Sequence, residues 1–185
     1  DNRQTITLKT YDRQGNYVSS FTFDPGVDTG LVFGRVANLG VEGSLVVGTY
    51  GGKRSEFSRG LFIGQQKGES DQEMRYFNYA DLENFFTYLK AGRQKRISEK
   101  ITRKKVKGKK VKFNYRLLVH DIIKNGDEYI MLGEAFYPKY NGSSTYGRYN
   151  PYGSMGNSGR DYMPSTFAGY RYTHATIAAF NEQGN

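Results

Sequence analysis

The residues from 111 to 132 read VKFNYRLLVHDIIKNGDEYIML, and this stretch decides the fold class. Apolar and polar side chains alternate over residues 111–119, which is the period of a half-buried β-strand. Asn125 and Gly126 follow, and Asn-Gly is the strongest short-range signal of a two-residue hairpin turn. A return strand is predicted to begin at Tyr129 and to run toward Tyr137. The stretch therefore predicts a β-hairpin in a mostly β chain.

Short strands separated by turn residues are also predicted through the first 70 residues. They cover residues 5–10, 17–23, 31–36, 43–50 and 61–65. Gly15 lies in the polar turn after the first of them, where a tight hairpin requires a positive φ. A last strand is expected over residues 172–180. The chain thus reads as a single β domain over residues 1–185, or as a fragment of a larger β structure.

Residues 78–110 break this pattern and predict a helical insertion. Asn78 is a suitable N-cap for a first helix, which ends at Ala91 and Gly92. Four apolar residues with the i, i+3, i+4, i+7 spacing of one helix face support it: Leu82, Phe85, Phe86 and Leu89. A second helix is predicted from residue 93 to about residue 105, broken by Gly108. Only two isoleucines mark its apolar side, so this helix should be mostly solvated.

The positive charge of the chain lies in one short segment. The net charge is +9, and residues 93–112 hold eleven Lys or Arg with a single acidic residue, so the rest of the chain is nearly neutral. We call residues 93–112 the basic segment. This charge either keeps a solvated, protruding connection soluble or contacts a protein partner with acidic surface, and the predicted contact residues are Arg103, Lys104, Lys105 and Lys107. Nucleic acid or an anionic lipid surface is the alternative, but the basic segment has no aromatic residue to stack on bases.

A second unusual region is rich in tyrosine and glycine. Residues 137–172 contain eight of the sixteen tyrosines and six glycines, and we interpret residues 138–169 as a long surface loop. Tyrosines on a glycine-rich scaffold supply rigid contact area with a polar tip. Stacking on sugar rings or docking a protein are both open uses. The predicted contact residues in the loop are Tyr146, Tyr149, Tyr152 and Tyr162.

Two parts of the sequence share one shape, and they carry a resemblance to a known family. Residues 45–50, 60–63 and 67–68 form the first unit, with Gly48 in the middle of its first strand; residues 129–134, 178–181 and 184–185 form the second, with Gly133 in the same place. These units resemble blades of bacterial β-propellers, which pair an inner strand bearing a glycine with a strand that ends in an Asp-Gly or Asn-Gly turn. The resemblance covers about half the chain.

The resemblance implies a propeller-like fold in a secreted or cell-envelope protein of a Gram-negative bacterium. Without the two excursions the chain keeps roughly 115 residues, which is two to three blades at roughly 40–50 residues each. Closed propellers have roughly four to eight blades, so the chain would hold incomplete propeller-like blades. A β-sandwich or small barrel with a short helical, Lys/Arg-rich insertion is the alternative.

Catalytic and cofactor motifs are scarce. The absence of cysteine excludes disulfides, thiol nucleophiles and Cys-ligated metals. His120 beside Asp121 could be half of a triad, but no nucleophile elbow accompanies it, and residues 51–55 lack the P-loop spacing. We expect no catalytic residue, no cofactor and no metal, and no apolar run reaches the ~18 residues of a membrane-spanning helix.

The sequence therefore predicts a non-catalytic binding or scaffold protein. Its expected setting, which the resemblance alone implies, is the periplasm, the outer membrane surface or the exterior of the cell. Two alternatives stay open: a polysaccharide-binding or glycan-processing propeller that uses the loop tyrosines, and an electrostatic nucleic-acid binder that uses the basic segment.

Overall fold

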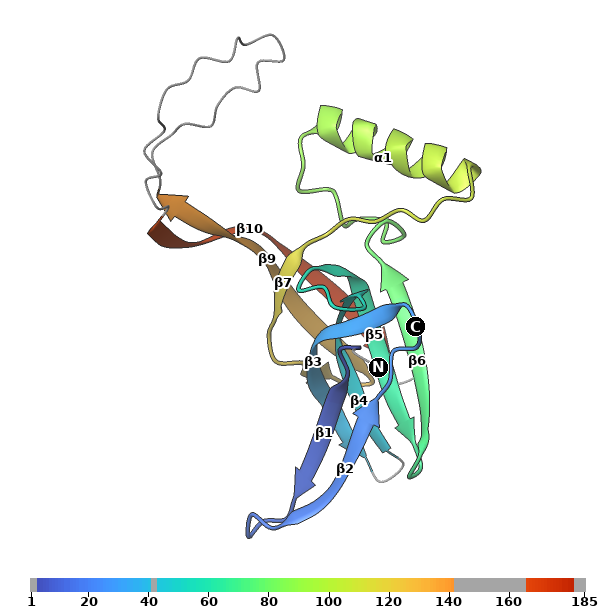
Figure 1. Ribbon diagram of the computed structural model, residues 1–185, viewed down its shortest axis with the longest axis vertical. Coiled ribbons are helices and arrows are strands. Elements are labelled where there is room, and N and C mark those ends of the chain that lie inside the picture. The colour runs from blue at the N-terminus through green and yellow to red at the C-terminus, as the bar shows by residue number, and fades with distance from the viewer. Residues whose placement is uncertain (1–2, 41–42, 142–165, 182–185) are drawn as a thin grey trace, which may run out of the picture.

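A computed structural model describes residues 3–40, 43–141 and 166–181, and it is mostly β (Figure 1). The elements are β1 (Ile6–Tyr11), β2 (Tyr17–Phe23), β3 (Thr29–Gly40), β4 (Gly43–Gly52), β5 (Ser58–Lys67), β6 (Asp71–Asn78), α1 (Ala91–Val106), β7 (Arg116–Val119), β8 (Ile123–Asn125), β9 (Glu128–Asn141) and β10 (Thr166–Asn181). Every strand pair among them is antiparallel. The prediction of a mostly β chain is confirmed.

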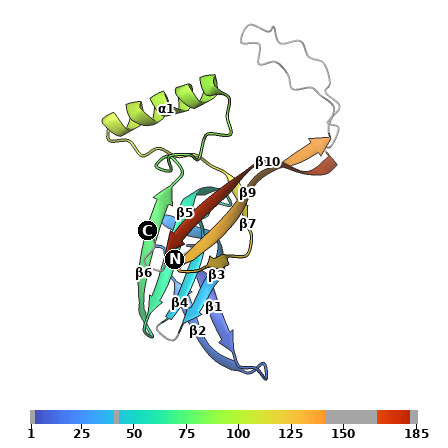
Figure 2. The ribbon, with the colours of Figure 1, turned by 180° about the vertical axis from the view of Figure 1, so that it is seen from behind.

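The strands form three layers. The hairpin β1–β2 lies on one face of a middle sheet with the order β3-β4-β5-β6, and the sheet β10-β9-β7, to which β8 adds, lies on the other face (Figures 1 and 2). Alternate residues of the middle strands enter different cores: Val46 packs with β1–β2, whereas Val47 packs with β9. Because both faces are covered, β4 and β5 carry continuous apolar runs instead of alternation.

The two units of the predicted repeat are two antiparallel strand pairs. β4 pairs with β5 in the middle sheet, and β9 pairs with β10 in the second sheet. Within the described residues none of the sheets closes on itself. The mostly β prediction is thus confirmed, while the propeller stays a prediction.

Some strands lie where the sequence predicted them, and others differ from the prediction. β1, β2 and the hairpin turn at Gly126, which has a φ of 60°, lie where they were predicted. β6 was not predicted, and the strand expected over 111–119 is regular only from Arg116. β9 and β10 extend into residues 138–141 and 166–169, which were predicted to be loop. The rest of that loop lies outside the described residues.

The first predicted helix is wrong. Residues 79–89 form consecutive turns, with backbone N–H groups bonded to carbonyls three residues earlier, as from Phe85 to Leu82 at 3.3 Å. The side chain of Asn78 accepts the N–H of Ala80 at 2.9 Å, which stabilises a turn at the position predicted to cap a helix. Phe85 stacks on Tyr79 with ring centroids 4.2 Å apart. The apolar residues therefore reach the core as predicted, but from turns.

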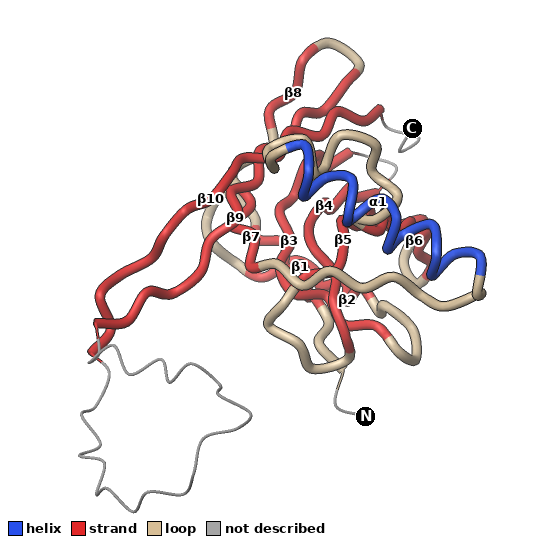
Figure 3. The backbone as a smooth tube through the Cα atoms, turned by 90° about the horizontal axis from the view of Figure 1, so that it is seen from above, coloured by secondary structure: helices blue, strands red, loops and turns tan. Residues whose placement is uncertain are grey.

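The second predicted helix is confirmed as α1, which lies across one end of the sheets (Figure 3). None of its residues is buried, and only Ile97 and Ile101 pack against the core. Basic residues fill its last turn, where they complement the negative end of the helix dipole. This helix is solvated, as its composition predicted.

Candidate functional site

A cavity of about 770 Å³ opens between the end of β4, the sheet edge and the chain that follows α1. Six cationic side chains line it: Lys53, Arg59, Lys105, Lys109, Lys110 and Lys112. Two carboxylates, of Asp28 and Asp81, also border it. We call this site the basic cavity. It brings Lys53, in the turn after β4, and Arg59 of β5 together with residues 105–112 of the basic segment.

The turn after α1 directs the basic segment onto the body. Gly108 has a φ of 61°, its N–H bonds to the carbonyl of Lys105 at 2.9 Å, and the N–H of Lys109 bonds to the carbonyl of Lys104 at 2.9 Å. This pair of bonds is a Schellman motif, which ends a helix and reverses the chain. The side-chain amide of Asn78 then donates to the carbonyl of Val111 at 3.2 Å. Residues 109–112 are thereby held beside the end of β6.

Arg59 is half-buried, whereas the other five cations that line the basic cavity are exposed. It is a residue of β5, and its guanidinium lies against Gly52, since a Cβ added to Gly52 would be 2.9 Å from the Arg59 Nη2. The Nε atom of Arg59 is buried and has no hydrogen-bond partner among the described residues. An N–H group without a partner can donate a hydrogen bond to an oxygen atom of a ligand.

The charges of the basic cavity are only partly neutralised. Lys105 Nζ lies 2.6 Å from Asp81 Oδ1, so this cation is paired. Lys109, Lys110 and Lys112 form no ion pair with any described residue. The cavity therefore keeps an excess of positive charge, which attracts anions.

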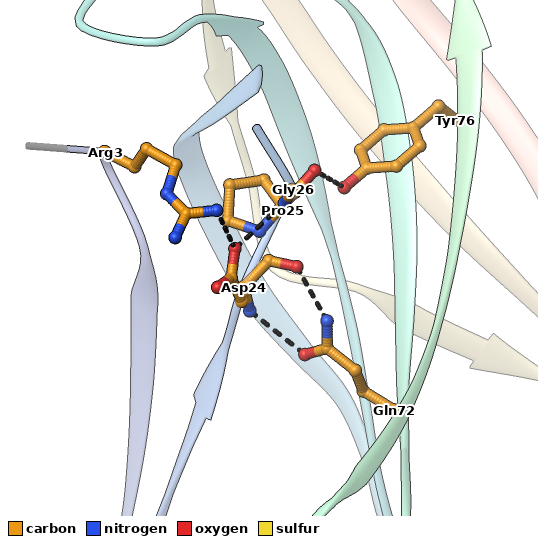
Figure 4. Close-up of polar contacts among 6 residues, drawn as sticks. All are labelled: Arg3, Asp24, Pro25, Gly26, Gln72 and Tyr76. Atoms are coloured by element: carbon orange, nitrogen blue, oxygen red, sulfur yellow. Dashed lines mark hydrogen bonds and ion pairs between the residues drawn. The ribbon is translucent and has the colours of Figure 1, made fainter. Parts of the chain in front are cut away.

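Two tyrosines, Tyr50 and Tyr76, form a wall of the basic cavity. A polar network holds Tyr76 in place (Figure 4). The side-chain amide of Gln72 donates to the carbonyl of Asp24 at 2.6 Å and accepts the Asp24 N–H at 3.0 Å. The hydroxyl of Tyr76 donates to the carbonyl of Pro25 at 3.1 Å. The rings of Tyr76 and Tyr50 pack edge-on, with centroids 4.9 Å apart. Burial raises the pKa of Tyr76 to about 12, so this wall is uncharged at neutral pH.

The structure brings one of the four predicted basic residues into this cavity. Lys105 lines it, whereas Arg103, Lys104 and Lys107 do not. Sequence reasoning missed Lys53 and Arg59, because the charge was expected to come from one contiguous segment. Lys53 lies in the glycine-rich residues 51–55, which lack the spacing of a phosphate loop, and no motif in the sequence marks Arg59.

A second surface is an aromatic ribbon. Beyond Phe136, where the pairing with β7 ends, β9 pairs only with β10, and the two strands project from the body (Figure 1). The register places five aromatic residues and a proline on one face of this aromatic ribbon: Phe136, Pro138, Tyr140, Phe167, Tyr170 and Tyr172. Tyr140 is 55% exposed and Tyr170 is 59% exposed. Contiguous exposed apolar surface of this kind commonly marks an interaction site.

A cleft of about 550 Å³ lies at the base of the aromatic ribbon. Arg116 crosses it toward Glu56, with Nη2 2.7 Å from Oε2, and its guanidinium lies 4.6 Å from the centre of the Phe57 ring. Aromatic surface with polar groups beside it is typical of ligand clefts. The four predicted loop tyrosines, Tyr146, Tyr149, Tyr152 and Tyr162, lie outside the described residues. The tyrosines of the aromatic ribbon were not among the predicted contacts.

The two histidines lie in different settings. His120 Nε2 lies 2.9 Å from Glu134 Oε2 across β7 and β9, while Asp121 lies 3.6 Å from Arg35 instead. The His120 and Asp121 pair considered from the sequence therefore does not form. Among the described residues, no three or more His, Asp or Glu side chains gather in a group that could hold a metal ion.

His174 is packed among aromatic rings. Its ring stacks on Tyr88 with centroids 3.6 Å apart, and the Tyr88 hydroxyl bonds to that of Tyr115 at 3.0 Å. Its Nδ1 lies 3.0 Å from the Thr173 hydroxyl, and its Nε2 is buried without a partner in the described part of the chain. Burial lowers the pKa of His174, so the folded protein favours the neutral ring.

This arrangement predicts that wild type loses stability in acid relative to the His174→Phe variant. The unfolded chain binds the proton near its ordinary pKa of 6.5, whereas the folded chain binds it at lower pH. The stability that the neutral His174 ring gives the folded state is therefore fully present above about pH 6.5, and it is lost as the pH falls below that value. Urea unfolding of both proteins between pH 8 and pH 5 measures it. Parallel pH profiles would contradict the prediction.

Comparison of the chain with family models, curated proteins and solved structures found no match. In the described part of the chain, no helix has the length and apolar character needed to cross a membrane.

Proposed function

We propose that this protein is a non-catalytic binding protein that captures an anionic partner at the basic cavity. The observation that carries the proposal is the convergence of cations from two distant segments, residues 53–59 and 105–112, on one concave site. A cleft lined by charge of one sign raises the local concentration of the opposite charge and speeds association. Lys109, Lys110 and Lys112 form no ion pair within the described ranges, which leaves their charge available to a ligand.

The wider setting we propose is a propeller-type assembly of the cell envelope or the exterior. Two observations support the propeller part of this proposal. The middle sheet has four strands side by side, as a propeller blade has. The second sheet packs against it face to face, with β7 and β8 both pairing with β9. A closed propeller needs more than two blades, so we propose that further blades complete the ring. The proposed cellular location rests on the resemblance to bacterial propeller blades alone.

Binding to a labelled polyglutamate, followed by fluorescence anisotropy, tests the proposed function. We expect affinity to fall steeply between 50 and 300 mM salt. The triple variant Lys109→Gln, Lys110→Gln and Lys112→Gln should weaken binding about tenfold at low salt, taking roughly 0.5 kcal/mol for each exposed ion pair that is lost. Affinity that does not change with salt would rule out the proposal.

The matched control removes the same charge far from the cavity. Arg13 lies in the turn of the β1–β2 hairpin, and Lys95 and Arg96 lie on exposed positions of α1. The variant Arg13→Gln, Lys95→Gln and Arg96→Gln should lose much less affinity, because salt screens distant charges. Equal losses in the two triple variants would show that net charge, not the cavity, attracts the partner.

A second candidate function is saccharide binding by the aromatic ribbon. The exposed rings of Tyr140 and Tyr170 on one face favour it, because flat rings provide stacking surfaces. Replacing both by alanine should leave polyglutamate affinity unchanged. Retention on immobilised polysaccharides that is lost in this variant, and kept in the lysine variant, would favour the second candidate over the first.

A further inference from the structure

We infer that the ligand of the basic cavity is a nucleotide, a phosphate ester that carries a flat heterocyclic ring. This inference rests on the proposed function and names the class of its anionic ligand. Three features of the cavity support it: the guanidinium of Arg59 among lysines, the volume, and the tyrosine wall.

Arg59 distinguishes a phosphate site from a general patch of positive charge. A guanidinium offers several N–H donors in a fixed plane, and it matches two oxygens of one phosphate group at once. The Nε donor of Arg59 is buried and unpartnered among the described residues, and the group is backed by Gly52. Lys109 and Lys110 line the same cavity and act as point charges, which suits the additional charge of a di- or triphosphate.

The volume of the basic cavity favours a small ligand over a polymer. About 770 Å³ lies within the roughly 300–1,000 Å³ of small-molecule sites. The end of β4 and residues 105–112 border the site. A nucleotide fits this concavity, whereas an extended strand needs a long groove to follow its backbone.

The tyrosine wall supplies the aromatic surface that the basic segment lacks. Tyr76 is 37% exposed, and its hydroxyl bond to Pro25 holds the ring in one orientation (Figure 4). Tyr50 packs against it edge-on. Stacking of a base on an aromatic side chain contributes roughly 1–3 kcal/mol, which is about 5- to 150-fold in affinity.

Isothermal titration calorimetry with four probes tests the inference: adenosine triphosphate, inorganic tripolyphosphate, single-stranded (dT)12 and polyglutamate. We expect adenosine triphosphate to bind at least about fivefold more tightly than tripolyphosphate, because the latter has no ring to stack. Arg59→Lys should weaken binding of the nucleotide at least tenfold and that of polyglutamate by a smaller factor, because lysine keeps the charge but loses the planar donor set.

Gly52→Ala is the second variant, and it moves the guanidinium without changing any charge. The added Cβ would lie 2.9 Å from the flexible end of Arg59, so the side chain shifts while the backbone stays. We expect weaker binding of the nucleotide here as well. The control variant Arg13→Gln, Lys95→Gln and Arg96→Gln should keep the nucleotide affinity of wild type, since none of these residues lines the cavity.

The outcomes separate this inference from the proposed function. Polyglutamate binding with no nucleotide binding overturns the inference alone, and so does equal affinity for adenosine triphosphate and tripolyphosphate. Binding of (dT)12 without binding of the mononucleotide overturns it in favour of a nucleic-acid strand. If none of the four probes binds, both the inference and the proposed function fail.

Discussion

Gly48→Ala is expected to destabilise the protein by about 3 kcal/mol or more, because overpacking against rigid backbone is among the costlier substitutions. Gly48 lies in the middle of β4, opposite Gly34 of β3. A Cβ at residue 48 would lie 1.9 Å from the carbonyl oxygen of Phe33 and 2.7 Å from the Cα of Gly34. Both atoms are backbone, so the two strands must separate to admit the methyl group.

Gly133→Ala is the matched control, because it changes the equivalent glycine of the second strand unit. There a Cβ would lie 2.8 Å from Cδ2 of Leu117, which is a side-chain atom. Leu117 can rotate away, so we expect a loss of only about 1 kcal/mol. Urea unfolding followed by circular dichroism compares the two variants. A loss at Gly48 no larger than that at Gly133 would contradict this account of the strand packing.

Phe62→Ala is expected to cost about 3–5 kcal/mol, which is the usual range for removing a buried aromatic ring. Phe62 is fully buried on β5, and it packs with Phe23 and Leu31 between the middle sheet and the hairpin. Removing the ring takes away much of the contact that holds β1–β2 on the sheet. The hairpin amides should therefore exchange with solvent faster than those of β9.

Hydrogen exchange and urea unfolding of the same samples check this result. Val18→Ala provides the control, since Val18 lies on β2 of the same hairpin and is 58% exposed. The free energy of unfolding of Val18→Ala should stay within about 0.5 kcal/mol of the wild-type value, as for most surface substitutions. Uniformly faster exchange in Phe62→Ala, with no preference for β1–β2, would show that the hairpin does not depend on this contact.

The strands could be predicted where a local signal set both their period and their ends. Gly15 marks a hairpin turn between β1 and β2, which lie as predicted. Gly126 marks a second turn, and β9 begins beside it as predicted, but the short strand β8 before the turn was not predicted. β6 was missed because its sequence, DQEMRYFN, is polar, and its residues are intermediate or exposed at the edge of the sheet. The helix predicted over residues 78–89 was wrong because apolar spacing shows which residues reach a core, not the backbone that carries them there.

The candidate site could be predicted only in part. The basic segment and the break at Gly108 were evident in the sequence, but the partner cations were not. Arg59 and Lys109 line one cavity, and the Asn78 side chain, bonded to the carbonyl of Val111 across 33 residues of sequence, holds the chain after α1 beside the sheet. Such a pairing depends on the assembled sheet. The aromatic ribbon was missed because β9 and β10 continue past the point where tyrosine and glycine content indicated a loop.

The burial of the middle sheet on both faces has a consequence for how this protein can change over evolutionary time. Most positions of β4 and β5 are buried, so few substitutions there can be silent. Natural variation should therefore accumulate in the outer layers, where the lysines of residues 109–112 and the rings of the aromatic ribbon lie. A relative could acquire a different ligand by altering those exposed positions while inheriting the same inner scaffold.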